Sequence, residues 1–105
     1  DDLIAGYRQV IRHAHAAGLK VVLATLPPFE GADYFTPEGE AIRQAVNIWL
    51  RRQTEADGVV DFDAALRDPA APARLSTAFH SGDWLHPSDA GYQAMAEAIP
   101  LDACD

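Results

Sequence analysis

Hydrophobic residues recur every three or four positions over residues 2–17, a spacing that places them on one face of a helix. This apolar stripe consists of Leu3, Ile4, Tyr7, Val10, Ile11 and Ala14. Gly18 follows where a helix C-cap is expected, because glycine enters the left-handed backbone conformation without steric cost. Residues 20–26 are then predominantly apolar and rich in β-branched side chains, and Pro27 ends the run. They predict a strand buried on both faces, as in a parallel sheet.

A second helix is predicted after a loop that covers residues 27–35. Thr36 is a suitable N-cap, Pro37 fits the first helical position, and Glu38 places an acid in the first turn. The apolar stripe of this helix consists of Ile42, Ala45, Val46, Trp49 and Leu50. We expect the whole stripe, Trp49 included, to face the core.

The remaining third of the chain predicts one more strand and one more long helix. Residues 59–62 form a short apolar run after an Asp-Gly turn, and residues 63–66 suit a single helical turn. Residues 68–75 contain two prolines and are expected to be irregular. The last helix is expected over residues 88–99, with Ser88 as its N-cap. Its shared apolar face consists of Tyr92, Met95, Ala96 and Ile99.

The order helix, strand, helix, strand, loop, helix predicts an α/β fold with right-handed crossovers and a parallel sheet covered by helices. Two strands make a poor sheet, since both are apolar throughout and both expect neighbours. We therefore expect an open strand edge and open apolar surface, and hence the C-terminal part of a larger α/β domain or a chain that pairs with another. The chain begins at Asp1 with neither Met nor a signal peptide, which is typical of a processed, cut or incomplete chain and leaves its compartment open, secretion included.

Charge and cysteine content exclude several classes of partner and cofactor. With 8 basic and 16 acidic residues, the net charge of −8 argues against binding to nucleic acid or to anionic lipid. The apolar run over residues 21–26 is far shorter than a membrane span. The only cysteine, Cys104, excludes an internal disulfide and a cysteine-based zinc site. The acidic runs 61–68 and 102–105 lack the spacing of a calcium loop, so solvated acids and no cofactor are expected.

Candidate chemistry concentrates in the polar loop over residues 80–88, directly before the last helix. Asp83 and His86 lie three residues apart, a spacing at which a tight turn lets the carboxylate accept a hydrogen bond from the imidazole Nδ1–H. That bond fixes the tautomer and leaves Nε2 as a base. The competing interpretation is an ordinary turn in which Asp83 caps a backbone amide. Trp84 in the same loop either packs the loop or lines an acyl or sugar pocket.

The sequence of residues 82–92, Gly-Asp-Trp-Leu-His-Pro-Ser-Asp-Ala-Gly-Tyr, resembles the final conserved block of the SGNH hydrolases, also called the GDSL lipase/acylhydrolase family. Residues 18–28 are similar to the late strand of that family and the loop after it. Residues 37–50 and 59–63 are similar to its last helix-strand pair. The resemblance implies a flavodoxin-like α/β/α sandwich and a Ser-His-Asp triad. In that triad Asp83 orients His86, which acts as general base and then as general acid.

The chain departs from the family pattern at the nucleophile. It contains neither Gly-Asp-Ser nor Gly-x-Asn-Asp, its serines are Ser76, Ser81 and Ser88, and its only asparagine, Asn47, lies within a predicted helix. We therefore expect residues 1–105 to be the C-terminal portion of one hydrolase domain. The serine and the oxyanion-hole groups are then supplied by an absent N-terminal part. The full-length protein is expected to be a serine esterase acting on a small-molecule ester, and this segment alone to be inactive.

Two other hypotheses stay open. One is a non-catalytic interaction or dimerisation segment, which presents its open strand edge to a partner. The other, a metal-dependent hydrolase, would use His80, Asp83 and His86 as ligands.

For the remaining candidate residues the sequence gives less specific expectations. Phe29, Tyr34 and Phe35 either form a substrate lip or pack. His13 and His15 are expected to be solvated, and Arg43, Arg51 and Arg52 are expected to be solvated or paired.

Overall fold

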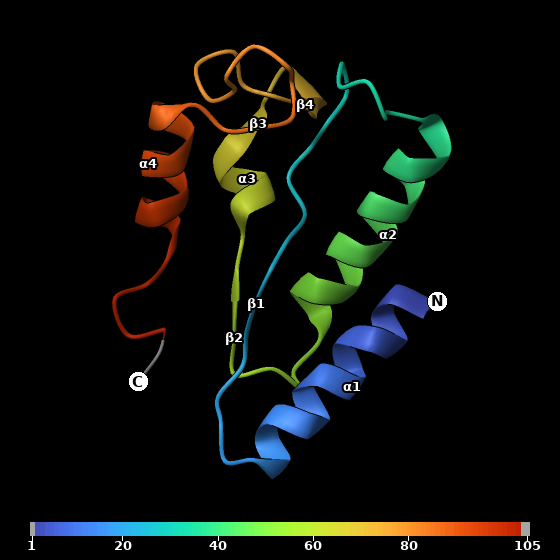
Figure 1. Cartoon of the computed structure of the whole chain (residues 1–105), viewed down its shortest axis with the longest axis vertical. Coiled ribbons are helices and arrows are strands. Elements are labelled where there is room, and N and C mark those ends of the chain that lie inside the picture. Colours follow the sequence, from blue (N-terminus) through green and yellow to red (C-terminus); the bar gives the residue numbers. More distant parts are fainter. Residues whose placement is uncertain (1, 104–105) are drawn as a thin grey trace.

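The computed structural model describes residues 2–103 of the chain, and within them helices and short strands alternate (Figure 1). The elements in chain order are α1 (Asp2–Ala16), β1 (Val22–Ala24), α2 (Pro37–Arg52), β2 (Gly58–Val60), α3 (Phe62–Leu66), β3 (Arg67–Asp68), β4 (Ala71–Leu75) and α4 (Asp89–Ala98). All predicted helices and both predicted strands are present, and the strands are shorter than expected. Cys104 lies outside the described residues.

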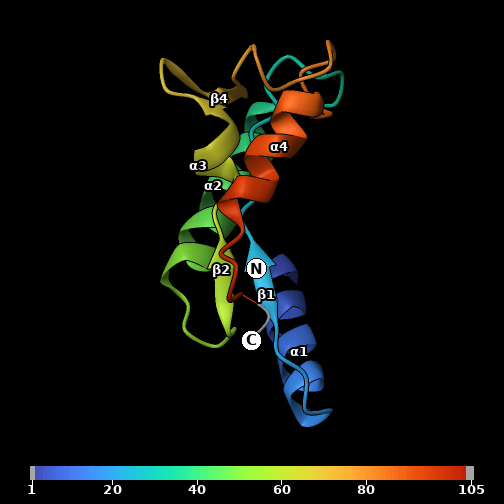
Figure 2. The same cartoon turned by 90° about the vertical axis from the view of Figure 1, so that its left-hand side faces the viewer.

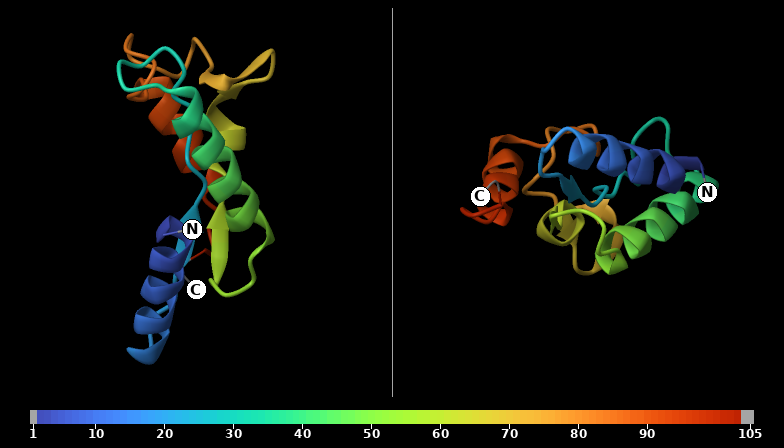
Figure 3. Two further views of the ribbon diagram at one scale, coloured as in Figure 1. Left: turned by 90° about the vertical axis from the view of Figure 1, so that its right-hand side faces the viewer. Right: turned by 90° about the horizontal axis from the view of Figure 1, so that it is seen from below.

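The centre of the fold is a parallel pair of strands with helices on both sides. β1 pairs with β2 in the register Val22↔Gly58, Leu23↔Val59 and Ala24↔Val60. The helices α1 and α2 lie on one side of this pair and α4 lies on the other (Figures 1 and 3). The chain is thus a mixed α/β fold with a small parallel sheet, as the alternation of elements predicts.

The core forms where α1 and α2 pack against β1. Its buried residues are Ile11, Val21, Leu23, Val46 and Leu50. The predicted stripe of α2 is only partly right, because Ile42 is 53% exposed and Trp49 is half-buried, stacked on Tyr7 at the edge of the core. The inward face of α2 instead carries two polar side chains, Arg43 and Asn47, beside Val46 and Leu50. Hydrophobic periodicity alone misses a helix face that is buried and polar.

The prediction of an irregular segment over residues 68–75 is wrong. β3 and β4 form an antiparallel hairpin, with Arg67 opposite Leu75 and an irregular register beside it. Pro69 lies in the turn between the two strands, and Pro72 is tolerated in β4 because each strand of a two-stranded sheet is an edge strand, where a missing N–H costs little. Leu75 is fully buried, which anchors the hairpin.

Apolar surface is exposed, as the sequence predicts for a two-stranded parallel sheet. Several large hydrophobic side chains are exposed, among them Leu3, Val10, Leu19, Ile48, Tyr92 and Ile99. A mainly apolar hollow of about 250 Å³ runs beside β1 and β2 and is bordered by Phe62 and Ile99. Among residues 2–103, none of the helices combines the length and the apolar character that a membrane span requires.

Candidate active site

The candidate site lies in the loop that precedes α4, where residues 79–88 close on themselves. The Ser81 N–H donates to the His86 carbonyl at 2.9 Å, and the Ser88 N–H donates to the Phe79 carbonyl at 2.8 Å. A bridge between His80 and Pro87 completes this hairpin-like closure. The loop therefore has a fixed shape although it contains no regular strand.

The first turn of α4 anchors this loop. Ser88 is the N-cap, as predicted: its Oγ accepts the Gly91 N–H at 3.1 Å and donates to the Ala78 carbonyl at 2.9 Å. Gly91 is in close contact with the loop, because a Cβ atom there would lie 2.3 Å from the Phe79 carbonyl oxygen. Only glycine allows α4 to approach the loop this closely.

Asp83 and His86 meet within the loop. The Asp83 Oδ2 atom lies 2.5 Å from His86 Nδ1, and Asp83 Oδ1 accepts the backbone N–H groups of Leu85 at 3.0 Å and His86 at 2.9 Å. The carboxylate therefore makes the predicted contact with the ring and also caps the turn. The His86 side chain is 67% exposed. Within residues 2–103 the His86 Nε2 atom has no hydrogen-bond partner.

The electrostatics of the pair favour an ionised carboxylate. The His86 ring hydrogen bond is the largest cause that lowers the pKa of Asp83 below its ordinary value, and the backbone N–H groups of His86 and Leu85 lower it further. An ionised carboxylate only accepts hydrogen bonds. The proton of a neutral His86 ring therefore sits on Nδ1, and the Nε2 lone pair is available to take a proton.

A small hollow borders the pair. Its volume is about 220 Å³, and it is lined by residues 31–34 on one side and 82–86 on the other. These loops meet at the end of the molecule where β1 and β2 have their carboxyl ends (Figure 2). Ligands of open α/β sheets bind at that edge.

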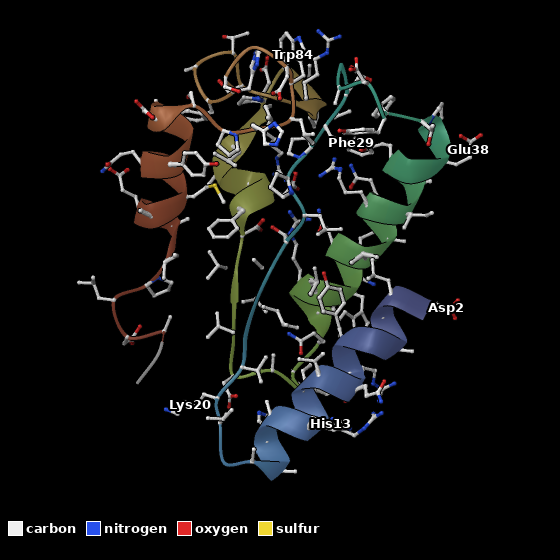
Figure 4. All side chains as sticks on the ribbon, viewed as in Figure 1. Asp2, His13, Lys20, Phe29, Glu38 and Trp84 are labelled. Atoms are coloured by element: carbon white, nitrogen blue, oxygen red, sulfur yellow. The ribbon has the colours of Figure 1, made fainter. Side chains whose placement is uncertain are left out.

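The three aromatic residues of the loop after β1 differ in their surroundings. Phe29 and Phe35 contact each other edge to face, with ring centroids 5.1 Å apart, so they pack. Tyr34 is 74% exposed and lines the hollow beside His86. Trp84 lies at the same end of the molecule as Phe29 (Figure 4), stacks on His80 and also lines the hollow.

Other candidate residues are engaged elsewhere. The Ser81 hydroxyl is 3.5 Å from an Asp83 oxygen, while the Ser88 hydroxyl is used in the cap. Asn47 is fully buried, and its amide clasps the backbone of Leu26, with Oδ1 accepting the N–H at 2.7 Å and Nδ2 donating to the carbonyl at 2.9 Å. Asn47 is therefore not placed to stabilise an oxyanion.

A metal site on His80, Asp83 and His86 is not formed. His80 Nδ1 is occupied by two backbone N–H groups, and Asp83 and His86 bind each other. In the described part of the chain no three His, Cys, Asp or Glu side chains gather in an arrangement that holds a metal ion.

A buried charge network joins α2 to α3, and the sequence did not predict it. Asp63 is 2% exposed and accepts hydrogen bonds from Arg43 at 2.7 Å, Arg51 at 2.7 Å and Arg67 at 2.9 Å. The expectation that the acids of residues 61–68 are solvated is thus wrong for Asp63. The available signal was the i, i+4 spacing of Arg43 and Asn47, which places both on the Leu50 face of α2.

This network ties the end of β1 to the residues after β2. The Thr25 hydroxyl donates to Asp61 at 2.8 Å and accepts the Asp63 N–H at 2.9 Å. Arg51 binds Asp61 through two nitrogens and is the largest cause that lowers the pKa of Asp61. The strand ends that carry the site loops are therefore held by charge-assisted bonds.

At the other end of the strands, His15 is paired with Asp57 at 2.8 Å rather than solvated alone.

An exposed imidazole, oriented by a carboxylate at the carboxyl edge of parallel strands, is the arrangement that hydrolases of the serine-triad class use for their base. The model of the GDSL-like lipase/acylhydrolase family matches residues 1–94, so the chain belongs to that family of ester hydrolases. It is 34% identical over 98 residues to the uncharacterized esterase YxiM of Bacillus subtilis (strain 168). That match covers 85% of this chain and 25% of the esterase, so the chain spans about a quarter of the length of this relative. The predicted resemblance of the chain to this family is confirmed.

Proposed function

We propose that the protein that carries this chain hydrolyses carboxylic esters through a Ser-His-Asp triad, in which this chain supplies Asp83 and His86. The observation that carries the proposal is the 2.5 Å contact between Asp83 Oδ2 and His86 Nδ1, together with the exposed ring. The membership of an ester hydrolase family supports the same chemistry.

The proposed mechanism follows from the tautomer. His86 Nε2 takes the proton of a serine hydroxyl as the oxygen attacks the ester carbonyl. The imidazolium that forms is stabilised by the Asp83 carboxylate, which is already ionised and already in contact. The same proton then passes from Nε2 to the leaving alkoxide, and a second cycle with water releases the acid.

The nucleophile and the oxyanion donors are proposed to come from outside residues 1–105. The hydroxyls of Ser81 and Ser88 are turned to Asp83 and to a carbonyl, and the Asn47 amide is buried. The apolar hollow beside β1 and β2 is suited to further elements of the same domain. On this proposal residues 1–105 are the C-terminal portion of one SGNH-type domain with a flavodoxin-like sandwich, and they have no activity alone.

The substrate is proposed to be a small-molecule ester. The hollow beside His86 has a volume of about 220 Å³, which suits a small acyl or alcohol group better than a long chain. Tyr34 and Trp84 provide aromatic walls for it.

A second candidate function is a non-catalytic interaction or dimerisation segment. The observations that favour it are the exposed hydrophobic side chains on α1, α2 and α4 and the apolar hollow beside β1 and β2. Under this alternative the protein binds a partner through that surface, and changes at His86 leave the binding intact.

The test is turnover of p-nitrophenyl acetate by the protein expressed from its full reading frame and by residues 1–105 alone. We expect activity in the full protein, its loss in His86→Ala, and none in the segment. His13→Ala is the matched control, because His13 is exposed on α1, away from the loop. Full activity in His86→Ala contradicts the proposed function, and an active segment contradicts the division of the triad.

A further inference from the structure

The two neighbours of Asp83 have unusual backbone conformations. Gly82 has a φ of 121° and Trp84 a φ of 59°. Trp84 is the only residue other than glycine in residues 2–103 with a positive φ. A tryptophan side chain disfavours this left-handed region, so the surrounding contacts must hold it there.

His80 makes those contacts. Its Nδ1 atom accepts the Gly82 N–H at 3.0 Å and the Trp84 N–H at 3.3 Å. Backbone N–H groups only donate, so Nδ1 carries a lone pair and the ring proton of His80 is on Nε2. The His80 ring also stacks on the Trp84 indole, with centroids 3.9 Å apart and an interplanar angle of 24°.

Arg74 and Gly31 also contact the Trp84 indole. The Arg74 guanidinium lies 4.9 Å from the centroid of the indole, and its Nε is bonded to Glu30 at 3.0 Å. Gly31 packs against the indole so closely that a Cβ atom there would lie 2.8 Å from Trp84 Cγ. The indole is therefore fixed by β4, by the loop after β1 and by His80.

From these contacts we propose that His80 is a positioning residue, whose Nδ1 holds the backbone N–H groups of Gly82 and Trp84, the residues before and after Asp83, and so keeps the carboxylate aimed at His86. The inference rests on the proposed function of Asp83 and His86. Because the N–H groups of Gly82 and Trp84 are held on either side of Asp83, the direction in which the Asp83 side chain leaves the backbone is constrained. A small error in that direction removes the orientation of the imidazole, on which proton transfer depends.

The test separates the acceptor atom of His80 from its ring, in the protein expressed from its full reading frame. His80→Asn keeps an acceptor, Oδ1, near the position of Nδ1. His80→Phe keeps an aromatic ring against Trp84 and removes the acceptor. His13→Phe is the matched control on the exposed face of α1. The readouts are kcat and KM for p-nitrophenyl acetate and the low-field proton resonance of His86 Nδ1–H, which is assigned by its loss in His86→Ala.

We expect His80→Phe to lower kcat by roughly tenfold to a hundredfold, with KM within about twofold of the original value. The low-field resonance weakens or disappears in this variant. His80→Asn and His13→Phe retain most of kcat and the resonance. If His80→Phe does not fold, His80→Gln replaces it, because its amide reaches the Nε2 position rather than Nδ1.

An unchanged kcat and an unchanged resonance in His80→Phe overturn the inference. A loss of kcat in His80→Asn as large as that in His80→Phe also overturns it, because it indicates that only the ring matters. Failure of the proposed function has a different signature. In that case the protein without substitutions lacks the low-field resonance of His86 Nδ1–H, or His86→Ala keeps full activity.

Discussion

At the scale of single residues, Asp83 performs two tasks with its two oxygens. Oδ1 caps the turn by accepting two backbone N–H groups, and Oδ2 contacts the imidazole of His86. The turn and the orientation of the ring are thus built by the same side chain. This division allows a substitution that affects one task and spares the other.

The substitution Asp83→Asn makes this separation. The amide oxygen still caps the turn, but the amide nitrogen is a donor and no longer accepts the Nδ1–H of His86. We expect kcat for p-nitrophenyl acetate in the full protein to fall by roughly 10³–10⁴-fold, the order seen when the orienting carboxylate of a serine triad is removed. The far-ultraviolet circular dichroism and the Tm should change little. A loss smaller than tenfold contradicts the orienting role.

The lowered pKa of Asp83 gives a prediction for pH. Because contact with His86 stabilises the ionised carboxylate, its contribution to stability is complete above the ordinary carboxyl pKa of about 3.9. That contribution is lost only as the pH falls through the lowered pKa of the folded state. Carbon-13 NMR of the Asp83 carboxyl should show a pKa below the ordinary range, and His86→Ala should raise it. An unchanged pKa in that variant contradicts the ring contact.

At the scale of elements, local signals predicted the helix ends and long-range contacts did not follow from sequence. Thr36 caps α2 and Ser88 caps α4, as expected from residue types that act within one turn. The contact of Asp83 with His86 was predictable for the same reason, since the two residues are three apart. The burial of Arg43 was not, because it depends on Asp63, twenty residues away. The β3–β4 hairpin likewise depends on burying Leu75, which its prolines concealed.

The charge network between α2 and α3 gives the prediction for this scale. Asp63→Ala removes the buried acceptor of three arginines, and Arg43, itself 3% exposed, loses one of its two carboxylate partners. We expect the free energy of unfolding to fall by about 3–5 kcal/mol, as measured by urea denaturation of the full protein. Glu97→Ala on the exposed face of α4 is the control, with a change within about 0.5 kcal/mol. A loss below about 1 kcal/mol contradicts a stabilising role for the network.

At the scale of the whole molecule, the layout separates the candidate site from the exposed apolar surface. The site loops meet at the carboxyl edge of β1 and β2, and the apolar hollow runs beside the same strands. Further strands that pack on this surface would end at the same carboxyl edge as β1 and β2, and the proposed mechanism needs a serine at that edge. The sequence predicted the open surface because two apolar strands require neighbours, but it contains no information on what provides them.

The most direct measurement of the central claim is covalent labelling of the full protein with a fluorophosphonate, followed by mass spectrometry of its peptides. We expect one labelled serine, outside residues 1–105, and a rate of labelling that drops sharply in His86→Ala and not in His13→Ala. An adduct on Ser76, Ser81 or Ser88, or labelling that proceeds equally fast without His86, contradicts the account.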